Sequence, residues 1–102
     1  MNLRILAEAE AEIELARAYL TGQASRLGDR FIADLQETLD AIAKRPERFS
    51  KLETLSDEAP YRRALLSIFR YAVIFETMSD EVLVVALAHA SREPNYWLDR
   101  RV

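Results

Sequence analysis

Residues 69–100 read FRYAVIFETMSDEVLVVALAHASREPNYWLDR, and this stretch decides the fold of the chain. Two segments within it, Tyr71 to Thr77 and Val82 to Ala88, are rich in Val, Ile, Leu, Tyr and Phe. The residues between them, MSDE, form a polar link of hairpin length. The stretch therefore predicts two antiparallel strands joined as a β-hairpin.

The second strand of this hairpin is apolar on both faces, whereas a half-solvated strand would alternate apolar and polar residues. With strict alternation, one face carries Val82, Val84 and Ala86, and the other carries Leu83, Val85 and Leu87. We therefore expect this strand to lie in the middle of the sheet, with helices covering at least one of its faces.

The residues after the hairpin, 89–100, are expected to leave the sheet, and they concentrate the chemically distinctive side chains. They include the only His and the only Trp of the chain, together with Tyr96, Arg92 and Arg100. His titrates near neutral pH, and Arg presents a rigid fork of donors to phosphate or carboxylate groups. We expect recognition or proton chemistry to depend on this segment.

The chain before the hairpin predicts a short strand and a first helix. Leu3 and Ile5 alternate with polar neighbours, which favours a strand at the N-terminus. Apolar residues then recur at intervals of three and four, at Leu6, Ala9, Ile13, Ala16 and Leu20. This helix should run from about Ala7 to Leu20, with Thr21-Gly22 as its stop signal. Its acidic residues are expected to form a solvated face.

A second helix is predicted from Ser25, as the N-cap, through Ile42, because Pro46 forbids its continuation. Gly28 falls inside this helix and costs about 1 kcal/mol of helix propensity relative to Ala, which a close approach of the two helices would offset. With about four residues between them, the helices should form an antiparallel αα-hairpin packed on the sheet.

Residues 46–60 are polar and bounded by prolines, which predicts a connection anchored by Phe49 and Leu52. Strand character resumes from Tyr61 to Ile68, and this strand should pair with the hairpin. The expected fold class is α+β: a short N-terminal strand, an αα-hairpin packed on a small antiparallel sheet (βααβββ), and a C-terminal tail. At 102 residues, the chain 1–102 is expected to be a single domain.

The composition argues against several classes of function. The chain has no Cys and one His, so we expect neither a metal site nor a cofactor. Its apolar runs are shorter than a membrane span and its N-terminal residues do not fit a secretory signal, which favours a cytoplasmic protein without membrane contact. The formal net charge of -3 argues against a DNA-coating protein, so no direct DNA binding is expected.

Taken together, these residues make the chain similar to the ParE branch of the ParE/RelE toxin superfamily, the toxins of type II toxin-antitoxin, or plasmid stabilisation, modules. The matching features, in chain order, are Tyr19-Leu20 ending an Ala/Glu-rich helix, Leu27-Gly28-Asp29-Arg30-Phe31, Ile42 with Arg45-Pro46 and Phe49, Arg62-Arg63 before Leu65-Leu66, Phe69-x-Tyr71, and Ala88-His89-x-x-Arg92-x-Pro94-x-Tyr96-Trp97-x-x-Arg100. The similarity spans nearly the entire chain. One departure is Arg70, because the family often has Phe-Pro-Tyr where this chain has Phe69-Arg70-Tyr71.

The resemblance implies a growth-inhibiting toxin that is held inactive by a cognate antitoxin. ParE-type members poison DNA gyrase by trapping it on cleaved DNA, which needs surface complementarity and no catalytic site. RelE-type members enter the ribosome and cleave messenger RNA, which is the alternative function. A third hypothesis is a non-toxic remnant that only interacts with an antitoxin. The antitoxin of the family lays a helix and an extended segment across an apolar groove, which we expect here between the helix hairpin and the sheet.

The candidate residues for binding the target or the antitoxin are Arg62, Arg63, Arg70, Tyr71, His89, Arg92, Tyr96, Trp97 and Arg100. Under the ribonuclease alternative, the candidate catalytic groups are His89, Arg92, Arg63 and Tyr96, with His moving a proton and Arg stabilising charge on the scissile phosphate. Structural roles compete with these. A lone His at a strand end is often a hydrogen bonder, Trp97 packs on the sheet as readily as on a partner, and surface arginines form weak ion pairs.

Overall fold

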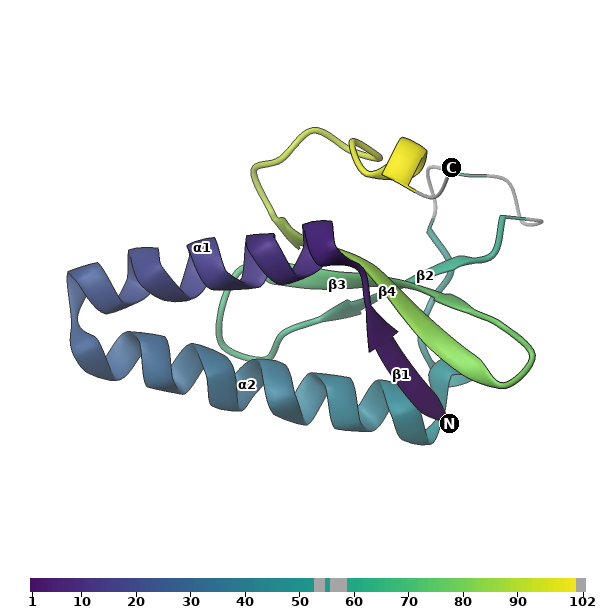
Figure 1. Cartoon of the computed structure of the whole chain (residues 1–102), viewed down its shortest axis with the longest axis horizontal. Helices are drawn as coiled ribbons and strands as arrows, with labels where there is room; N and C mark the ends of the chain where they lie inside the picture. Colours follow the sequence, from purple (N-terminus) through teal and green to yellow (C-terminus); the bar gives the residue numbers. More distant parts are fainter. Residues whose placement is uncertain (53–54, 56–58, 101–102) are drawn as a thin grey trace.

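The computed structural model of the chain describes residues 1–52, 55 and 59–100. Its elements follow in the order β1 (Asn2–Ile5), α1 (Ala7–Gln23), α2 (Ser25–Lys44), the 3-10 turn η1 (Pro46–Arg48), β2 (Tyr61–Leu65), β3 (Tyr71–Thr77), β4 (Glu81–His89) and the 3-10 turn η2 (Leu98–Arg100). Figure 1 shows the two long helices side by side against the sheet. The predicted α+β class and the order βααβββ are confirmed.

The strands form one sheet in the order β1-β4-β3-β2, so β4 is a central strand, as its two apolar faces predict. β2 pairs with β3 and β3 with β4 in antiparallel fashion. β1, however, pairs with β4 in parallel, from Asn2 opposite Glu81 to Ile5 opposite Val84. The sheet is therefore mixed and not wholly antiparallel, because the long helical connection after β1 imposes no hairpin geometry on this pair.

A β-bulge in β4 changes which side chains face the helices. Ile74 lies opposite Ala86 and Phe75 opposite Val84, so Val85 is an extra residue on the β4 side. Beyond the bulge the alternation is reversed. Leu87 therefore joins the helix-facing core, and Ala86 joins the other face. Strict alternation assigned these two residues to the opposite faces and was wrong at this point.

The helices pack as the predicted antiparallel hairpin, although their link is shorter than expected. α1 continues through Thr21 and Gly22 to Gln23, and the extended residue Ala24 alone separates it from α2. Gly22 does not adopt a positive φ, so it does not act as a left-handed helix stop. Ala24 is also the N-cap of α2, where Ser25 was expected.

Gly28 lies where the two helices approach closely, as its position inside α2 suggested. A Cβ atom at this residue would meet the Thr21 side chain and lie 3.4 Å from the Arg17 carbonyl oxygen. The absence of a side chain therefore lets α1 and α2 pack directly, which offsets the propensity cost of glycine. No helix in the described part of the chain is long and apolar enough to cross a membrane.

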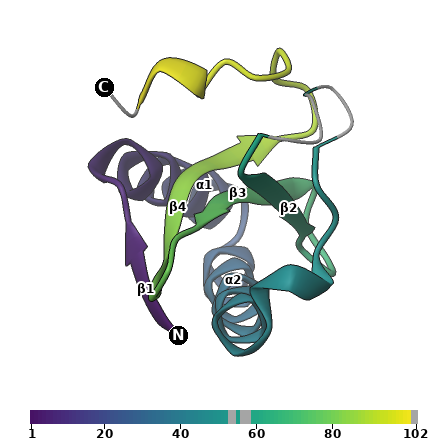
Figure 2. The same ribbon diagram turned by 90° about the vertical axis from the view of Figure 1, so that its right-hand side faces the viewer.

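Each face of the sheet buries its own apolar cluster. The helix-facing cluster includes Ala9, Ala16, Phe31, Leu35, Ile42, Val73, Phe75, Val82, Val84 and Leu87. The other cluster includes Ala72, Ile74, Leu83, Val85, Ala86 and Trp97. Figure 2 shows residues 90–100, which we call the strap, lying across the sheet on the side away from α2. The strap therefore covers the face that the helix hairpin leaves open.

The segment before β2 is anchored as predicted where the structure describes it. The Phe49 ring packs edge-on against Phe75 at 5.9 Å, and Leu52 contacts the cluster beneath the strap. The expected connection 46–60 also includes residues 53–54 and 56–58, which lie outside the described residues. β2 ends at Leu65 and not at Ile68, because the following residues turn away from the sheet to bind Asp34.

Candidate functional site

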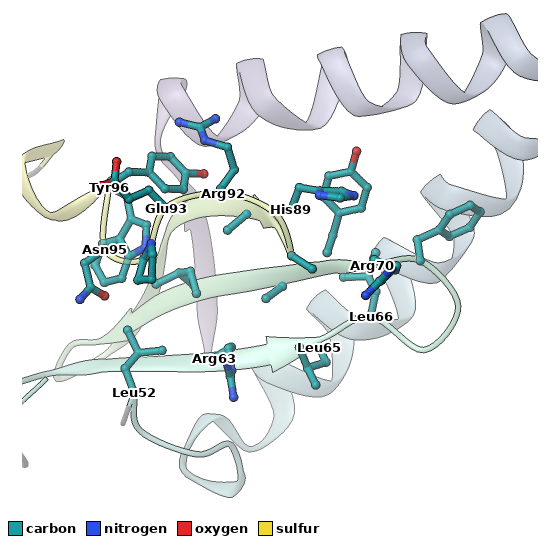
Figure 3. Close-up of a pocket in the computed structure, with 18 residues that line it drawn as sticks. Leu52, Arg63, Leu65, Leu66, Arg70, His89, Arg92, Glu93, Asn95 and Tyr96 are labelled. Atoms are coloured by element: carbon teal, nitrogen blue, oxygen red, sulfur yellow. The ribbon is translucent and has the colours of Figure 1, made fainter. Parts of the chain in front are cut away.

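A cavity of about 490 Å³ lies on the strap side of the sheet, between the ends of β2, β3 and β4 and the strap (Figure 3). Its floor is apolar and includes Leu65, Leu66, Ala72, Ile74 and Ala88. Seven of the nine candidate residues line it: Arg63, Arg70, Tyr71, His89, Arg92, Tyr96 and Trp97. The fold thus gathers residues from three separate parts of the chain into one pocket. We call it the arginine pocket.

The groove was expected between the helix hairpin and the sheet, whereas the arginine pocket lies on the strap side of the sheet. Side chains of α1 and α2 pack against the helix-facing side of the sheet in a buried cluster. A smaller cavity of about 200 Å³ does lie beside α1, lined by residues that include Leu15, Tyr19, Leu87 and His89. The larger opening forms where the strap spans the sheet without filling the space beneath it.

Three exposed arginines surround the apolar floor. Arg63 stands on β2, Arg70 ends the loop before β3, and Arg92 lies on the strap. Within the described residues, none of the three is in salt-bridge range of a carboxylate. A pocket with an apolar floor and cationic edges fits a ligand that combines apolar groups with negative charge.

The loop that carries Arg70 is held from below by α2. Asp34 is 3% exposed, and its carboxylate accepts hydrogen bonds from the backbone N–H groups of Ser67, Ile68 and Phe69. The backbone carbonyl oxygen of Arg70 in turn accepts a hydrogen bond from the Ala90 N–H, at the start of the strap. The buried carboxylate thus sets the path of the chain at one end of the pocket. The sequence did not single out Asp34.

His89 and Tyr71 face each other as paired residues of β4 and β3, with ring centroids 5.0 Å apart. The Nδ1 atom of His89 accepts a hydrogen bond from the Ser91 N–H at 3.0 Å and lies 2.8 Å from the Ser91 hydroxyl. In the neutral imidazole this acceptor role places the proton on Nε2. His89 therefore has an established local hydrogen-bonding role, which is the structural alternative named from the sequence.

Tyr96 is bound on both its ring and its hydroxyl group. The Arg92 guanidinium lies 3.8 Å from the ring centroid, and the hydroxyl donates a 2.6 Å hydrogen bond to Glu12. Burial, followed by the hydrogen bond to Glu12 and the negative charge of that residue, raises the pKa of Tyr96 to about 12. A phenol bound in this way is a poor proton donor near neutral pH, which disfavours it as a ribonuclease group.

Trp97 packs on the sheet, as one of the two sequence interpretations allowed. It is 3% exposed, and its ring lies 4.7 Å from that of Tyr61 in an edge-to-face arrangement. Its indole ring helps hold the strap down. The side chain therefore shapes the arginine pocket from within and offers little surface to a partner.

Two candidate arginines lie outside the arginine pocket. Arg62 faces the opposite side of β2 from Arg63 and donates a 2.6 Å hydrogen bond to the Phe49 carbonyl oxygen. Arg100 forms a two-pronged ion pair with Glu12, with Nη1–Oε1 and Nη2–Oε2 distances of 2.8 Å and 2.9 Å. Both arginines therefore stabilise the fold by contacts that the sequence did not reveal.

Glu12 departs from the solvated acidic face expected for α1. Its side chain is 13% exposed and also accepts a hydrogen bond from the Leu87 N–H. Burial alone would raise the pKa of Glu12, but hydrogen bonds from Arg100, Tyr96 and Leu87 outweigh it and lower this pKa below its ordinary value of 4.5. The sequence contained no signal that Glu12 would be buried, because it is one of four glutamates, at positions 8, 10, 12 and 14, that occupy every second position.

Comparison with known proteins identifies the class. The profile of the family described as ParE toxin of type II toxin-antitoxin system, parDE, matches residues 3–94. A solved chain described as "Chromosomal ParDE TA system from P. aeruginosa" is similar in fold, with a TM-score of 0.73 and 12% sequence identity. This match covers 87% of the present chain and 95% of the other. None of the curated protein sequences is significantly similar.

The family match extends over most of the chain, from β1 to the first half of the strap. The protein therefore belongs to the ParE family of toxins of type II toxin-antitoxin systems. At 12% identity the structural neighbour shows a shared fold. The family resemblance read from the sequence is confirmed.

Proposed function

We propose that this protein inhibits growth by poisoning DNA gyrase and that a cognate antitoxin neutralises it by occupying the arginine pocket. The observation that carries the proposal is the match to the ParE family together with an open apolar pocket edged by arginines. ParE-type toxins act on gyrase through surface contact, so the proposal requires no hydrolytic site. A cytoplasmic location follows from the same proposal, because gyrase acts on chromosomal DNA.

The chemistry of the pocket supports a peptide segment with acidic and apolar side chains as its occupant. Apolar side chains would cover Leu65, Ala72 and Ile74, while carboxylates would pair with the arginines at the rim. Arg63, Arg70 and Arg92 come from different elements around the pocket, so a segment that pairs with all three has to cross it. Such a segment belongs to the antitoxin in the resemblance stated above.

The ribonuclease alternative receives less support from the site. Of its four candidate groups, Tyr96 has its hydroxyl bound to Glu12, and the Nδ1 atom of His89 is bound to Ser91. RelE-type cleavage depends on side chains that are free to exchange protons with RNA. The family match also points to the ParE branch.

The deciding experiment is pulse labelling of DNA and protein synthesis in the minutes after induction of the chain without an antitoxin. Gyrase poisoning predicts that DNA synthesis stops first. An early stop of protein synthesis would overturn this target in favour of the ribosome. Full growth without inhibition, despite well-folded protein, would instead identify a non-toxic family member.

The antitoxin part of the proposal has its own test. Replacing Arg63 and Arg70 together by Ala should weaken binding of the purified antitoxin at least tenfold, because both charges border the pocket. The matched control replaces Arg26 and Arg30, two exposed arginines on α2 away from the pocket. Equal affinity of both double variants would place the antitoxin on another surface.

A further inference from the structure

Within the described residues, the edge of β4 that faces β1 pairs with no strand beyond Val84. β1 accompanies β4 only from Glu81 to Val84, and the chain then turns away into α1 after Leu6 donates to the Val84 carbonyl oxygen. The next backbone groups on this edge are the Val85 carbonyl and the Leu87 N–H. Open groups of this kind normally require another strand or a covering element.

Side chains of α1 and the strap take the place of that strand. The Arg100 guanidinium donates to the Val85 carbonyl oxygen at 3.0 Å, and Glu12 accepts from the Leu87 N–H at 3.0 Å. The Tyr96 hydroxyl, which donates to Glu12, also lies 3.4 Å from the Leu87 carbonyl oxygen. Glu12 therefore joins α1, the edge of β4 and the strap at one point.

The contacts at Glu12 hold the far half of the strap in place. A backbone hydrogen bond from Ala90 to the Arg70 carbonyl oxygen attaches the strap at its start, and the buried Trp97 packs its far half on the sheet. Tyr96 and Arg100 then attach its far half to Glu12. Arg92 is stacked on the Tyr96 ring, so the position of this rim arginine follows the position of Tyr96.

We propose that Glu12 is a positioning residue that closes the strap over the sheet and thereby places Arg92 at the rim of the arginine pocket. Glu12 does not line that pocket, and it acts through Tyr96 and Arg100. Without the carboxylate, the far half of the strap lifts, the edge of β4 opens and the wall of the pocket is lost. The importance of the pocket wall for antitoxin binding rests on the proposed function, whereas the closure of the strap does not.

Trp97 makes the closure measurable, because it is the only tryptophan of the chain and lies in the strap. In the full-length protein, Glu12→Gln should shift Trp97 emission to longer wavelength and raise the acrylamide quenching constant at least threefold. Far-UV circular dichroism should stay unchanged, because the helices and strands remain. The control Glu14→Gln alters an exposed carboxylate that pairs with Arg17, and its fluorescence should match that of the original protein.

Unchanged quenching in folded Glu12→Gln protein would overturn the proposal. If that variant does not fold, Tyr96→Phe decides, because it keeps the Glu12–Arg100 ion pair and removes only the hydroxyl. Tyr96→Phe should raise the quenching constant by a smaller factor, about 1.5-fold to twofold, because one bond of charge-assisted strength is lost. Quenching equal to that of the original protein in Tyr96→Phe would likewise overturn the proposal.

Antitoxin affinity, measured with the purified antitoxin, separates positioning from general destabilisation. If Glu12 acts through Arg92, then Glu12→Gln and Arg92→Ala should weaken antitoxin binding by similar factors, and the double variant should bind no more weakly than either. Additive losses would contradict the positioning role. If the original protein does not bind the antitoxin, the antitoxin part of the proposed function fails, and the fluorescence experiment still decides whether Glu12 closes the strap.

Discussion

The carboxylate of Asp34 accepts a hydrogen bond from the backbone N–H of Ile68, 34 residues further along the chain, at 2.9 Å. Ser67 and Phe69 donate to the same carboxylate at 3.1 Å and 3.3 Å. Three successive N–H groups form a concave anion site, and a side chain of α2 fills it. The helix hairpin thereby holds the loop that leads to Arg70 and Tyr71.

Replacing Asp34 should therefore destabilise the protein strongly. We expect Asp34→Ala to lower the free energy of unfolding by about 3 kcal/mol, because three N–H groups lose a charged acceptor. Urea titration measures this change. The control Asp40→Ala removes an exposed carboxylate that accepts a hydrogen bond from Gln36 and should cost no more than about 0.5 kcal/mol. Equal losses in the two variants would contradict the anchoring role of Asp34.

Gly28 and Thr21 should show strong coupling. Gly28→Ala alone should lower the free energy of unfolding by about 1 kcal/mol, because the cost of overpacking against Thr21 exceeds the gain in helix propensity. With Thr21→Ala in the same chain, the clash is relieved, and the double variant should be more stable than Thr21→Ala alone. Thermal unfolding of the four proteins tests this expectation. A loss from Gly28→Ala that is the same in both backgrounds would show that Thr21 is not the obstacle.

The ion pair of Glu12 predicts a specific dependence of stability on pH. The pKa of Glu12 is lower in the folded protein than in the unfolded chain, so its contribution is complete above about 4.5, the ordinary value. This contribution is lost as the pH falls through the folded pKa. Arg100, Tyr96 and Glu8 act on the same cluster, and Arg92 and His89 line the adjoining small cavity.

Comparing the unfolding free energy of the original protein with that of Glu12→Gln separates the contribution of this carboxylate from those of the neighbouring titratable groups. The difference in unfolding free energy between the original protein and Glu12→Gln should be constant from pH 6 to 7 and should shrink as the pH is lowered below about 4.5. Urea titration at each pH provides the measurement. A difference that grows on acidification would mean that the sign of the pKa shift is wrong.

Leu65 is 67% exposed at the end of β2 and contributes an apolar surface to the arginine pocket. Leu65→Glu and Leu65→Lys should each change the stability by less than about 0.5 kcal/mol, because the site is solvated. Antitoxin binding should weaken in both, and more in Leu65→Glu, because a new carboxylate repels an acidic segment. Isothermal titration calorimetry checks both variants. Equal weakening would show that only the apolar contact matters at this position.

Much of the fold was predictable because local patterns were strong. Two apolar segments around MSDE formed the expected hairpin, and the doubly apolar strand proved to be the centre of the sheet. The faces of Ala86 and Leu87 in β4 were predicted incorrectly, because a bulge depends on how two strands fit and leaves little trace in sequence. The first helix extends to Gln23, beyond its expected end near Leu20, because Gly22 does not adopt the positive φ of a left-handed helix stop.

For the candidate site, the chain alone indicated the residue types and the tertiary structure decided their roles. The concentration of His, Trp, Tyr and Arg after β4 located the strap, and seven of the nine candidates line one pocket. Arg62 and Arg100 could not be separated from the others, because their partners are a backbone carbonyl of Phe49 and a carboxylate 88 residues away.

The sequence by itself determined the class of fold and the family, because both depend on periodicity and on residue order along the chain. Only the tertiary structure decided that Glu12 and Asp34 are buried anchors while other acids of the same helices remain in water. The physical reason is that a carboxylate is stable in a buried position only where donors surround it. Those donors come from the edge of β4, the strap and the loop before β3, and folding alone brings them together.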